Sequence, residues 1–234
     1  MKKTYDQWSA DFKKLRECES PTQNEINRVI EYYKEHSPPP EGLRKQWIHD
    51  LGFRKNIVAG MDRGEQEIER LLLGSRGDIR TIRVEKKDQS VELIISEHNF
   101  PFAATRKGQV ISDALGYHRS RNDFRPVAIE VKVSDGTPWF AVVENLIQVR
   151  LARSNVKNIE EHGRLKVLKT SPPRRVRGSW GLVVAPRSYY DDPTMEITHR
   201  LINQLKERTR ARIMLATIDK NKMECLRWFC GYWP

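Results

Sequence analysis

The sequence predicts an α/β domain in which a mixed central sheet is flanked by helices, with a small helical module in front of it. Three observations lead to this prediction. Apolar and polar residues alternate within residues 82–95, as they do in strands with one buried face. Near-continuous apolar runs at 126–133, 180–185 and 213–216 are typical of strands that are buried on both faces. Between these runs, apolar residues recur at helical spacing.

The composition favours a globular protein with an anionic partner. The chain has 234 residues, enough for one domain with an appendage, and hydrophobic residues make up 38% of it, which argues against disorder of the whole chain. Its net charge of +11 comes from 42 Lys and Arg against 31 Asp and Glu. Nucleic acid is the partner that such an excess most often serves, and a basic soluble protein without such a partner is the alternative.

Cysteine usage and hydropathy indicate a cytoplasmic location. Cys18, Cys225 and Cys230 form no CxxC pair and fit no zinc-ligand spacing, which is typical of a reducing compartment. The basic N-terminus lacks the apolar segment of a signal peptide, and no apolar run is long enough to span a membrane. We therefore expect no membrane partner.

Residues 1–55 are expected to form the helical module. Apolar residues recur at helical spacing over 5–15, 26–33 and 43–51, and the three prolines at 38–40 must end the second helix. Two interpretations are open for this module: it packs against the main domain, or it contacts DNA or a protein partner.

The main domain, residues 56–234, follows with alternating elements. We expect a helix at 62–72, a hairpin at 82–95 with its turn at 87–90, a strand at 110–113 that leads to Asp113, and a strand at 126–133. A helix at 137–153, which begins at Thr137-Pro138, is followed by a basic loop at 164–177 and a strand at 180–185. A helix at 192–205, which begins at Asp192-Pro193, precedes two further strands at 213–216 and 223–229.

Two charges interrupt the apolar run at 126–133 and require an explanation. Side chains two apart on a strand share a face, so the Glu130 carboxylate and the Lys132 ammonium lie side by side. Carboxylates of Glu130 and Asp113, with the carbonyl of Val131, would make half of a Mg²⁺ site, which Mn²⁺ can also fill. Lys132 would then orient or deprotonate a water molecule and stabilise developing charge during phosphodiester hydrolysis.

The acid-x-Lys triplet is not specific by itself. Asp11-Phe12-Lys13 and Glu85-Lys86-Lys87 match it as well. The apolar strand around Glu130 and Lys132, the upstream Asp113 and the following helix distinguish the third match. The alternative is a structural Glu130–Lys132 ion pair at a sheet edge, with Asp113 as an ordinary turn residue.

With Asp113 and Glu130-Val131-Lys132 in this order, the sequence resembles the PD-(D/E)xK nucleases over about residues 60–186. The segment Gly64-Glu65-Gln66-Glu67-Ile68 and the strand Ile129-Glu130-Val131-Lys132 look like those of archaeal Holliday junction resolvases. The resemblance implies a restriction-endonuclease-like core with Asp113 at the end of a strand. It also implies that Glu65 and Gln148 contribute to the active site.

The sequence departs from the family pattern at three places. Ser112 replaces the usual proline before the Asp, and Ala152 stands where RecB-like members have Tyr. The interval before Asp113 is long, so we expect residues 97–108 to be an insertion or a substrate loop. The departures leave the subfamily open and remove no metal-binding residue.

Basic residues near the proposed site are candidate phosphate contacts. They lie before the Asp113 strand, in the loop expected after it, and in the basic loop. These residues are Arg106, Lys107, His118, Arg119, Arg121, Arg174, Arg175 and Arg177.

The sequence thus predicts a metal-dependent nuclease that acts on DNA, with RNA not excluded. An endonuclease in defence, restriction, repair or recombination is the expected role, and cutting both strands of a duplex would favour a homodimer. Two alternatives stay open: a non-catalytic nucleic-acid-binding protein on the same fold, and a regulator whose helical module reads DNA. The Pro-rich break after Tyr33 argues against a helix-turn-helix in that module.

Overall fold

A computed structural model describes residues 5–34, 80–105, 108–120, 123–134, 136–154, 175–176, 178–218 and 225–234. Its described helices are α1 (Tyr5–Arg16), α2 (Gln23–Lys34), α5 (Pro138–Ser154), α7 (Met195–Arg208) and the 3₁₀ helix η1 (Arg187–Asp191). Its described strands are β1 (Arg80–Lys86), β2 (Gln89–Thr105), β3 (Gly108–Ser120), β4 (Asp123–Val131), β5 (Arg175–Val176), β6 (Trp180–Pro186), β7 (Ile213–Ile218) and β8 (Cys225–Gly231).

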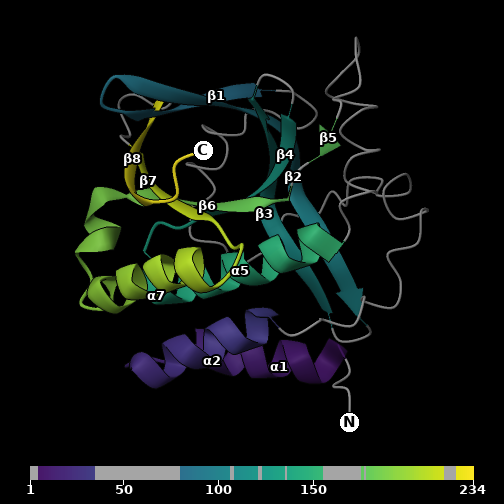
Figure 1. Ribbon diagram of the computed structural model, residues 1–234, viewed down its shortest axis with the longest axis vertical. Coiled ribbons are helices and arrows are strands. Elements are labelled where there is room, and N and C mark those ends of the chain that lie inside the picture. The colour runs from purple at the N-terminus through teal and green to yellow at the C-terminus, as the bar shows by residue number, and fades with distance from the viewer. Residues whose placement is uncertain are drawn as a thin grey trace.

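The strands close into a barrel (Figure 1). In the described sheet the order is β3-β2-β1-β8-β7-β6-β4, and β3 pairs with β4 to complete a ring of seven strands, with β5 attached to β4. The pairing is mixed: β1 with β8, β4 with β6 and β6 with β7 are parallel, and the other pairs in the ring are antiparallel. Closure leaves no edge strand in the ring.

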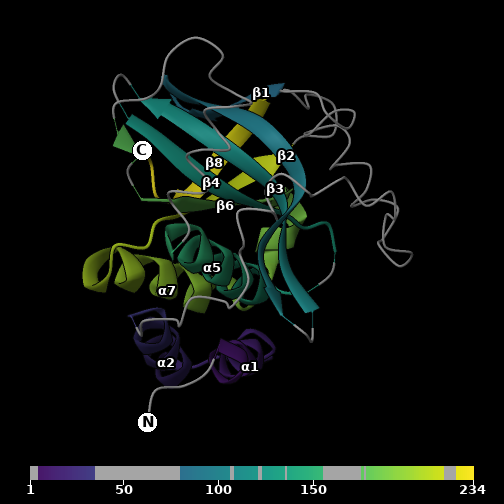
Figure 2. The same ribbon diagram turned by 90° about the vertical axis from the view of Figure 1, so that its right-hand side faces the viewer.

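The predicted restriction-endonuclease-like core, an open mixed sheet flanked by helices, is therefore wrong. The sheet closes because β3 pairs with both β2 and β4. β8 lies between β1 and β7 and joins the two halves of the ring. Helices cover one side of the barrel, with α5 and α7 against the strands and α1 and α2 beyond them (Figures 1 and 2).

The long β2–β3 hairpin makes this closure possible. Its register shifts between Ile95 and Glu97 and again between Pro101 and Ala103, and such bulges bend and twist a strand pair. Residues 97–105 belong to β2, so the insertion or substrate loop expected at 97–108 is replaced by strand. The interval before Asp113 is long because the hairpin is long.

Most elements predicted from periodicity are confirmed. The structure contains the hairpin with its turn at 87–90 and the helices predicted at 137–153 and 192–205, with ends within a few residues of those predicted. It also contains the strands predicted at 126–133, 180–185, 213–216 and 223–229. The predicted helices at 43–51 and 62–72, Glu65 among them, lie outside the described residues.

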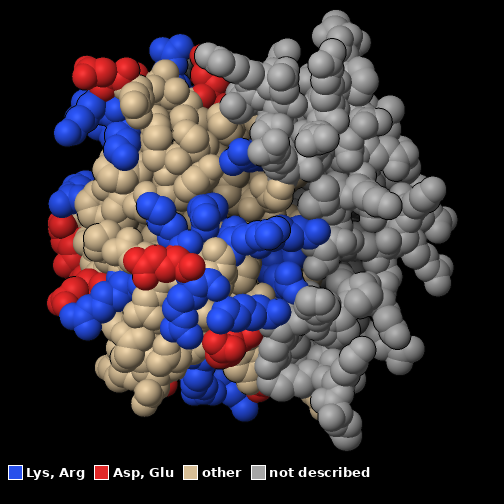
Figure 3. Space-filling model, in the orientation of Figure 1, with Lys and Arg blue, Asp and Glu red and all other residues tan. Residues whose placement is uncertain are grey.

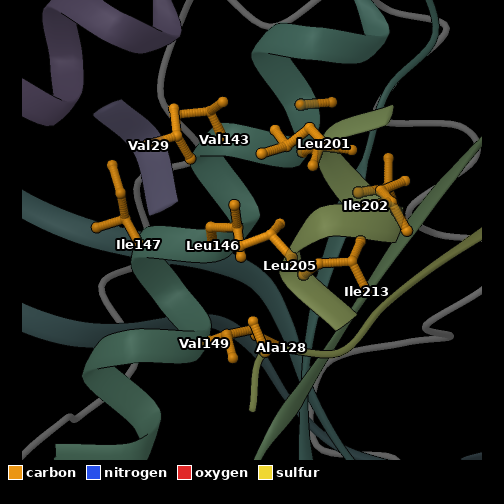
Figure 4. Packing of buried hydrophobic residues seen from close by; sticks show 14 of the residues in the cluster. Val29, Ala128, Val143, Leu146, Ile147, Val149, Leu201, Ile202, Leu205 and Ile213 are labelled. Atoms are coloured by element: carbon orange, nitrogen blue, oxygen red, sulfur yellow. The ribbon is translucent and has the colours of Figure 1, made fainter. Parts of the chain in front are cut away.

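Two separate hydrophobic clusters hold the structure together. One fills the barrel and includes Ile129, Val131 and Leu182. The other lies between the barrel and the helices, where Leu146, Val149, Leu201 and Leu205 of α5 and α7 face Ala128 and Ile213 (Figure 4). Ile26, Val29 and Ile30 of α2 belong to this second cluster, which confirms the packing interpretation for α1 and α2.

No described helix is both long and apolar enough to cross a membrane.

Candidate active site

Strand β4 divides its side chains between the two clusters. Val127, Ile129 and Val131 point into the barrel, whereas Ala128 belongs to the cluster under the helices. By the same alternation Glu130 points toward α5. The two charges in the apolar run thus lie at the boundary between barrel and helix layer, where the side chains of Glu130 and Lys132 are only 5% and 12% exposed.

Both oxygens of Glu130 have a partner. Oε1 lies 2.7 Å from the Lys132 ammonium nitrogen, and Oε2 accepts a 2.6 Å hydrogen bond from Nε2 of Gln148 on α5. Glu130 of the predicted strand thereby contacts Gln148 of the helix predicted after it. An isolated buried carboxylate would be costly, and these two partners reduce that cost.

Asp113 joins this group from the neighbouring strand. Its Oδ2 accepts a 2.6 Å hydrogen bond from the backbone N–H of Val131, just beyond the last β3–β4 residue pair, Ala114 with Ile129. Asp113 lies within β3, which runs on to Ser120, so its predicted place at a strand end is wrong. Ser112, which replaces the family's proline, has Oγ 2.9 and 2.6 Å from the carbonyl oxygens of Ala114 and Ile129.

Three further residues of this network were not predicted. Oε2 of Glu144 on α5 lies 3.2 Å from the Lys132 ammonium, and its Oε1 accepts a 2.7 Å hydrogen bond from Arg16 at the end of α1. Asn145 donates through Nδ2 to Oε1 of Gln148, at 2.9 Å, and to the carbonyl of Ala128, at 3.1 Å. The spacing of Glu144 and Gln148, one helical turn apart, was the available signal for Glu144. Arg16 offered none, because its contact spans 128 positions of the chain.

The N-terminal helices are therefore attached directly to the site. Besides the Arg16–Glu144 pair, the indole N–H of Trp139 donates to the carbonyl of Leu15 at 2.8 Å. The guanidinium of Arg16 and the ammonium of Lys132 both lie near the ring of Phe140, 4.5 and 5.6 Å from its centroid. The end of α1 thus places a second cation beside Lys132.

The pKa values of Glu130 and Lys132 are both raised in this group. Burial, followed by the charges of Asp113 and Glu144, raises the pKa of Glu130 well above its ordinary value, although Lys132 opposes this. Burial alone would lower the pKa of Lys132, but the charges of Glu130, Glu144 and Asp113 hold it above its ordinary value. Lys132 therefore stays protonated at neutral pH, and the carboxylates around it repel one another.

The donor set is compatible with a divalent cation, although it is small. Among the described residues no group of three or more His, Cys, Asp or Glu side chains is arranged to hold a metal ion. Mg²⁺ keeps several waters and commonly uses only one or two carboxylates, so Asp113 and Glu130 are enough side chains. In a strand the N–H and C=O of one residue point the same way, which directs the Val131 carbonyl toward the Asp113 side as well. Mutual repulsion of the carboxylates is what a cation would relieve.

The predicted phosphate contacts are only partly described. His118 is 8% exposed and lies on β3, so the loop expected there is wrong: the strand continues through it. Arg119 lies on β3 and Arg175 on β5, and their side chains are not described. Arg106, Lys107, Arg121, Arg174 and Arg177 lie outside the described residues.

No protein-family model, curated protein or solved structure matches the chain.

We predict that Gly181→Ala disrupts the hydrogen bonds of the site through Asn145. A Cβ at Gly181 would stand 1.8 Å from Oδ1 of Asn145, so Asn145 must move and release Gln148. We expect a loss of about 1–3 kcal/mol in the free energy of unfolding, measured by urea denaturation, because buried hydrogen bonds are broken. Gly178→Ala is the control, since its nearest neighbour would be the Arg153 side chain at 3.5 Å; equal losses in both variants would contradict the proposed role of Asn145.

We also predict a pH-dependent stability difference for Glu130→Gln. The raised pKa means that Glu130 ionises in the unfolded chain at a lower pH than in the folded protein. Wild-type stability is then lost as pH rises from the ordinary carboxylate range toward the raised folded value, whereas the Gln variant loses none by this route. The free energy of unfolding of the variant should gain on the wild type by about 1 kcal/mol or more between acidic and neutral pH. Glu92→Gln, at an exposed position of β2, is the control, and a flat difference for Glu130→Gln would contradict the raised pKa.

Proposed function

We propose that this protein is a metal-dependent nuclease that hydrolyses phosphodiester bonds of DNA, with Asp113, Glu130 and Lys132 at the centre of its active site. The observation that carries the proposal is that residues singled out from the sequence converge. Asp113 contacts the peptide between Glu130 and Val131, and Lys132 and Gln148 contact the two oxygens of Glu130. The resemblance to PD-(D/E)xK nucleases now rests on these residues alone, because the barrel is not the open sheet that the resemblance implies.

Asp113, Glu130 and the Val131 carbonyl would hold the cation, Mg²⁺ or Mn²⁺. Such an ion supplies Lewis-acid polarisation of the phosphate and a bound water of lowered pKa. The chain prepares this site by holding the Glu130 carboxylate in place from two sides, through Lys132 and Gln148. Asp113 holds Val131, the residue whose carbonyl is the third ligand, through its N–H.

Lys132 would act through its charge. Its raised pKa keeps the ammonium protonated, which favours stabilisation of charge on the phosphate over the alternative of deprotonating the attacking water. Arg16 would add a second positive charge on the same side, since Glu144 contacts both cations. When the substrate enters, Arg16 and Lys132 can release Glu144 and contact a phosphate oxygen in its place.

The charge of the whole chain supports a nucleic-acid substrate. Lys and Arg exceed Asp and Glu by 11, and on the face drawn in Figure 3 they gather across the middle of the described surface, with a few Asp and Glu among them. A positive surface attracts the phosphate backbone and releases its counterions. We propose DNA rather than RNA as the substrate and internal rather than terminal cutting, in defence, restriction, repair or recombination. A cytoplasmic location, supported by three free cysteines, and a homodimer belong to the same proposal.

One observation favours a second candidate, a non-catalytic nucleic-acid-binding protein. Glu130 is 5% exposed and both its oxygens are occupied by protein groups, as in a structural ion pair. In that case the network would hold α5 and α1 on the barrel, and the basic surface would bind DNA without cutting it.

We predict that Lys132→Ala and Asp113→Asn each reduce metal-dependent cleavage of plasmid and branched DNA by about 10²–10³-fold, because Lys132 stabilises charge on the phosphate and Asp113 holds the metal ion. Initial cleavage rates with Mg²⁺ or Mn²⁺ are the measurement. Lys206→Ala, which removes an exposed lysine from α7, should cut at the wild-type rate.

Folding of each variant is checked by its thermal unfolding midpoint. Cleavage that persists in both folded variants would contradict the proposed site. A wild-type protein that binds DNA but cuts it with neither metal would favour the non-catalytic alternative.

A further inference from the structure

One end of the barrel differs in chemistry from its apolar interior. Along β1 the residues that face the interior are Ile82 and Val84, and the next in this series is Lys86. Along β3 the series from Ala114 ends in His118. The barrel interior therefore changes from aliphatic to cationic and aromatic at this end.

Strand pairing brings the corresponding ends of the other strands to the same level. His118 is paired with Arg125, and Val127 with Trp180. Arg212 precedes β7 at the position next to Trp180, because Gly181 is paired with Ile213. We call this end the aromatic mouth; it is formed by Lys86, His118, Arg125, Trp180, Arg212, Trp228, Tyr232 and Trp233.

Figures 1 and 2 show the C-terminus at one end of the barrel, within the outline of the strands in Figure 1. The same face in Figure 3 shows an uncharged area with Lys and Arg side chains on several sides and a few Asp and Glu at its upper edge. The ammonium nitrogen of Lys86 lies 3.9 Å from the ring centroid of Trp228 and 5.5 Å from that of Trp233. The guanidinium carbon of Arg212 lies 6.0 Å from the ring centroid of Tyr232. The mouth thus combines ring faces with cations.

Polar groups inside the mouth are buried without a partner. Within the described part of the chain, Nδ1 of His118 and the indole N–H groups of Trp180 and Trp228 have no hydrogen bond. His118 is 8% exposed and Trp180 only 1%. Burial and the charge of Arg125 lower the pKa of His118, so its imidazole is neutral at physiological pH. A buried donor without a partner is costly, and a cluster of such groups at one end of a barrel indicates a ligand that satisfies them.

Tyr232 shows what kind of group fits there. Its ring lies edge-to-face with Trp180, with centroids 5.8 Å apart, and its hydroxyl oxygen accepts a 2.9 Å hydrogen bond from Arg125. The backbone is fixed nearby, because the N–H of Tyr232 donates to the carbonyl of Ile213 at 2.7 Å and Gly231 has φ of 90°. The Tyr232 side chain thus shows that this place fits a planar ring with an oxygen directed at Arg125.

We propose that the aromatic mouth binds a nucleotide, whose base takes the place of the Tyr232 ring while its phosphate meets the cations at the rim. A base offers ring nitrogen and carbonyl acceptors for the indole N–H groups of Trp180 and Trp228, which the tyrosine ring leaves unsatisfied. Aromatic rings stack on bases, and Lys86, Arg125 and Arg212 supply charge for a phosphate. An apolar ligand would leave the polar groups unsatisfied, and the cations would repel a metal ion.

This site is separate from the proposed active site. Arg125 and Glu130 share β4 but lie about 17 Å apart at the usual rise per strand residue, one facing the interior and the other facing α5. The nucleotide can be free or part of an unpaired strand, since both present the same base and phosphate.

The test is an equilibrium titration of the full chain, in EDTA, with AMP, dTMP, a ten-residue oligo(dT) and inorganic phosphate, monitored by calorimetry. We expect Arg125→Met and Trp180→Phe to weaken nucleotide binding by about tenfold, as loss of a charge-assisted contact or an indole donor does. Tyr232→Ala should tighten binding several-fold, because it removes the group that occupies the site. Lys206→Ala, which removes an exposed lysine from α7, should bind as wild type does.

Equal affinity for mononucleotides and oligo(dT) would identify a free nucleotide as the ligand, and binding of oligo(dT) alone would identify a strand. Binding to inorganic phosphate as tight as to nucleotides would overturn the proposal, because the base would then contribute nothing. So would weaker binding in Tyr232→Ala, or no binding of either the mononucleotides or oligo(dT) at millimolar concentration. None of these results depends on cleavage, so a failure of the nuclease proposal is distinguished from a failure of this one.

Discussion

The burial of the Glu130 carboxylate is the constraint on which the rest of the site depends. A carboxylate between a barrel strand and a helix is costly, so each neighbouring element contributes a group to it or to its partners: Lys132 from the end of β4, Gln148 from α5, and, through Glu144, Arg16 from α1. The network thereby links the barrel, the covering helix and the N-terminal helices. Even so, three carboxylates, those of Asp113, Glu130 and Glu144, share the one lysine, Lys132. Burial and the two neighbouring carboxylates raise the pKa of Glu130, and a bound cation would relieve the repulsion.

Strand β4 organises both proposed sites. Its interior face fills the barrel and ends in Arg125 at the aromatic mouth, whereas its outer face carries Glu130 toward α5. Closing the sheet into a barrel separates these faces completely, since one is enclosed by strands and the other is covered by helices (Figures 1 and 2). Two different chemistries can therefore stand on one strand without contact between them.

Local pattern was enough to predict most of the elements and to single out Asp113, Glu130 and Lys132, and the family resemblance added Gln148. The alternation of Glu130 and Lys132 within an apolar run implied a shared face, and the structure shows their contact. Closure of the sheet was not predictable in this way, because it depends on the pairing of β1 with β8 and of β3 with β4, which periodicity within a segment does not encode. Arg16 and Asn145 were missed for a related reason: their roles come from the packing of α1 and α5, and isolated arginines and asparagines are common on helices.

Calorimetric titration of Mn²⁺ into the wild-type protein and into Asp113→Asn tests the central claim most directly, because it measures cation binding without any substrate. The account predicts one metal ion bound per chain in the wild type, with release of protons as Glu130 ionises, and at least tenfold weaker binding in the variant. Absence of binding to the folded wild-type protein at millimolar Mn²⁺, or equal binding by both proteins, would contradict it.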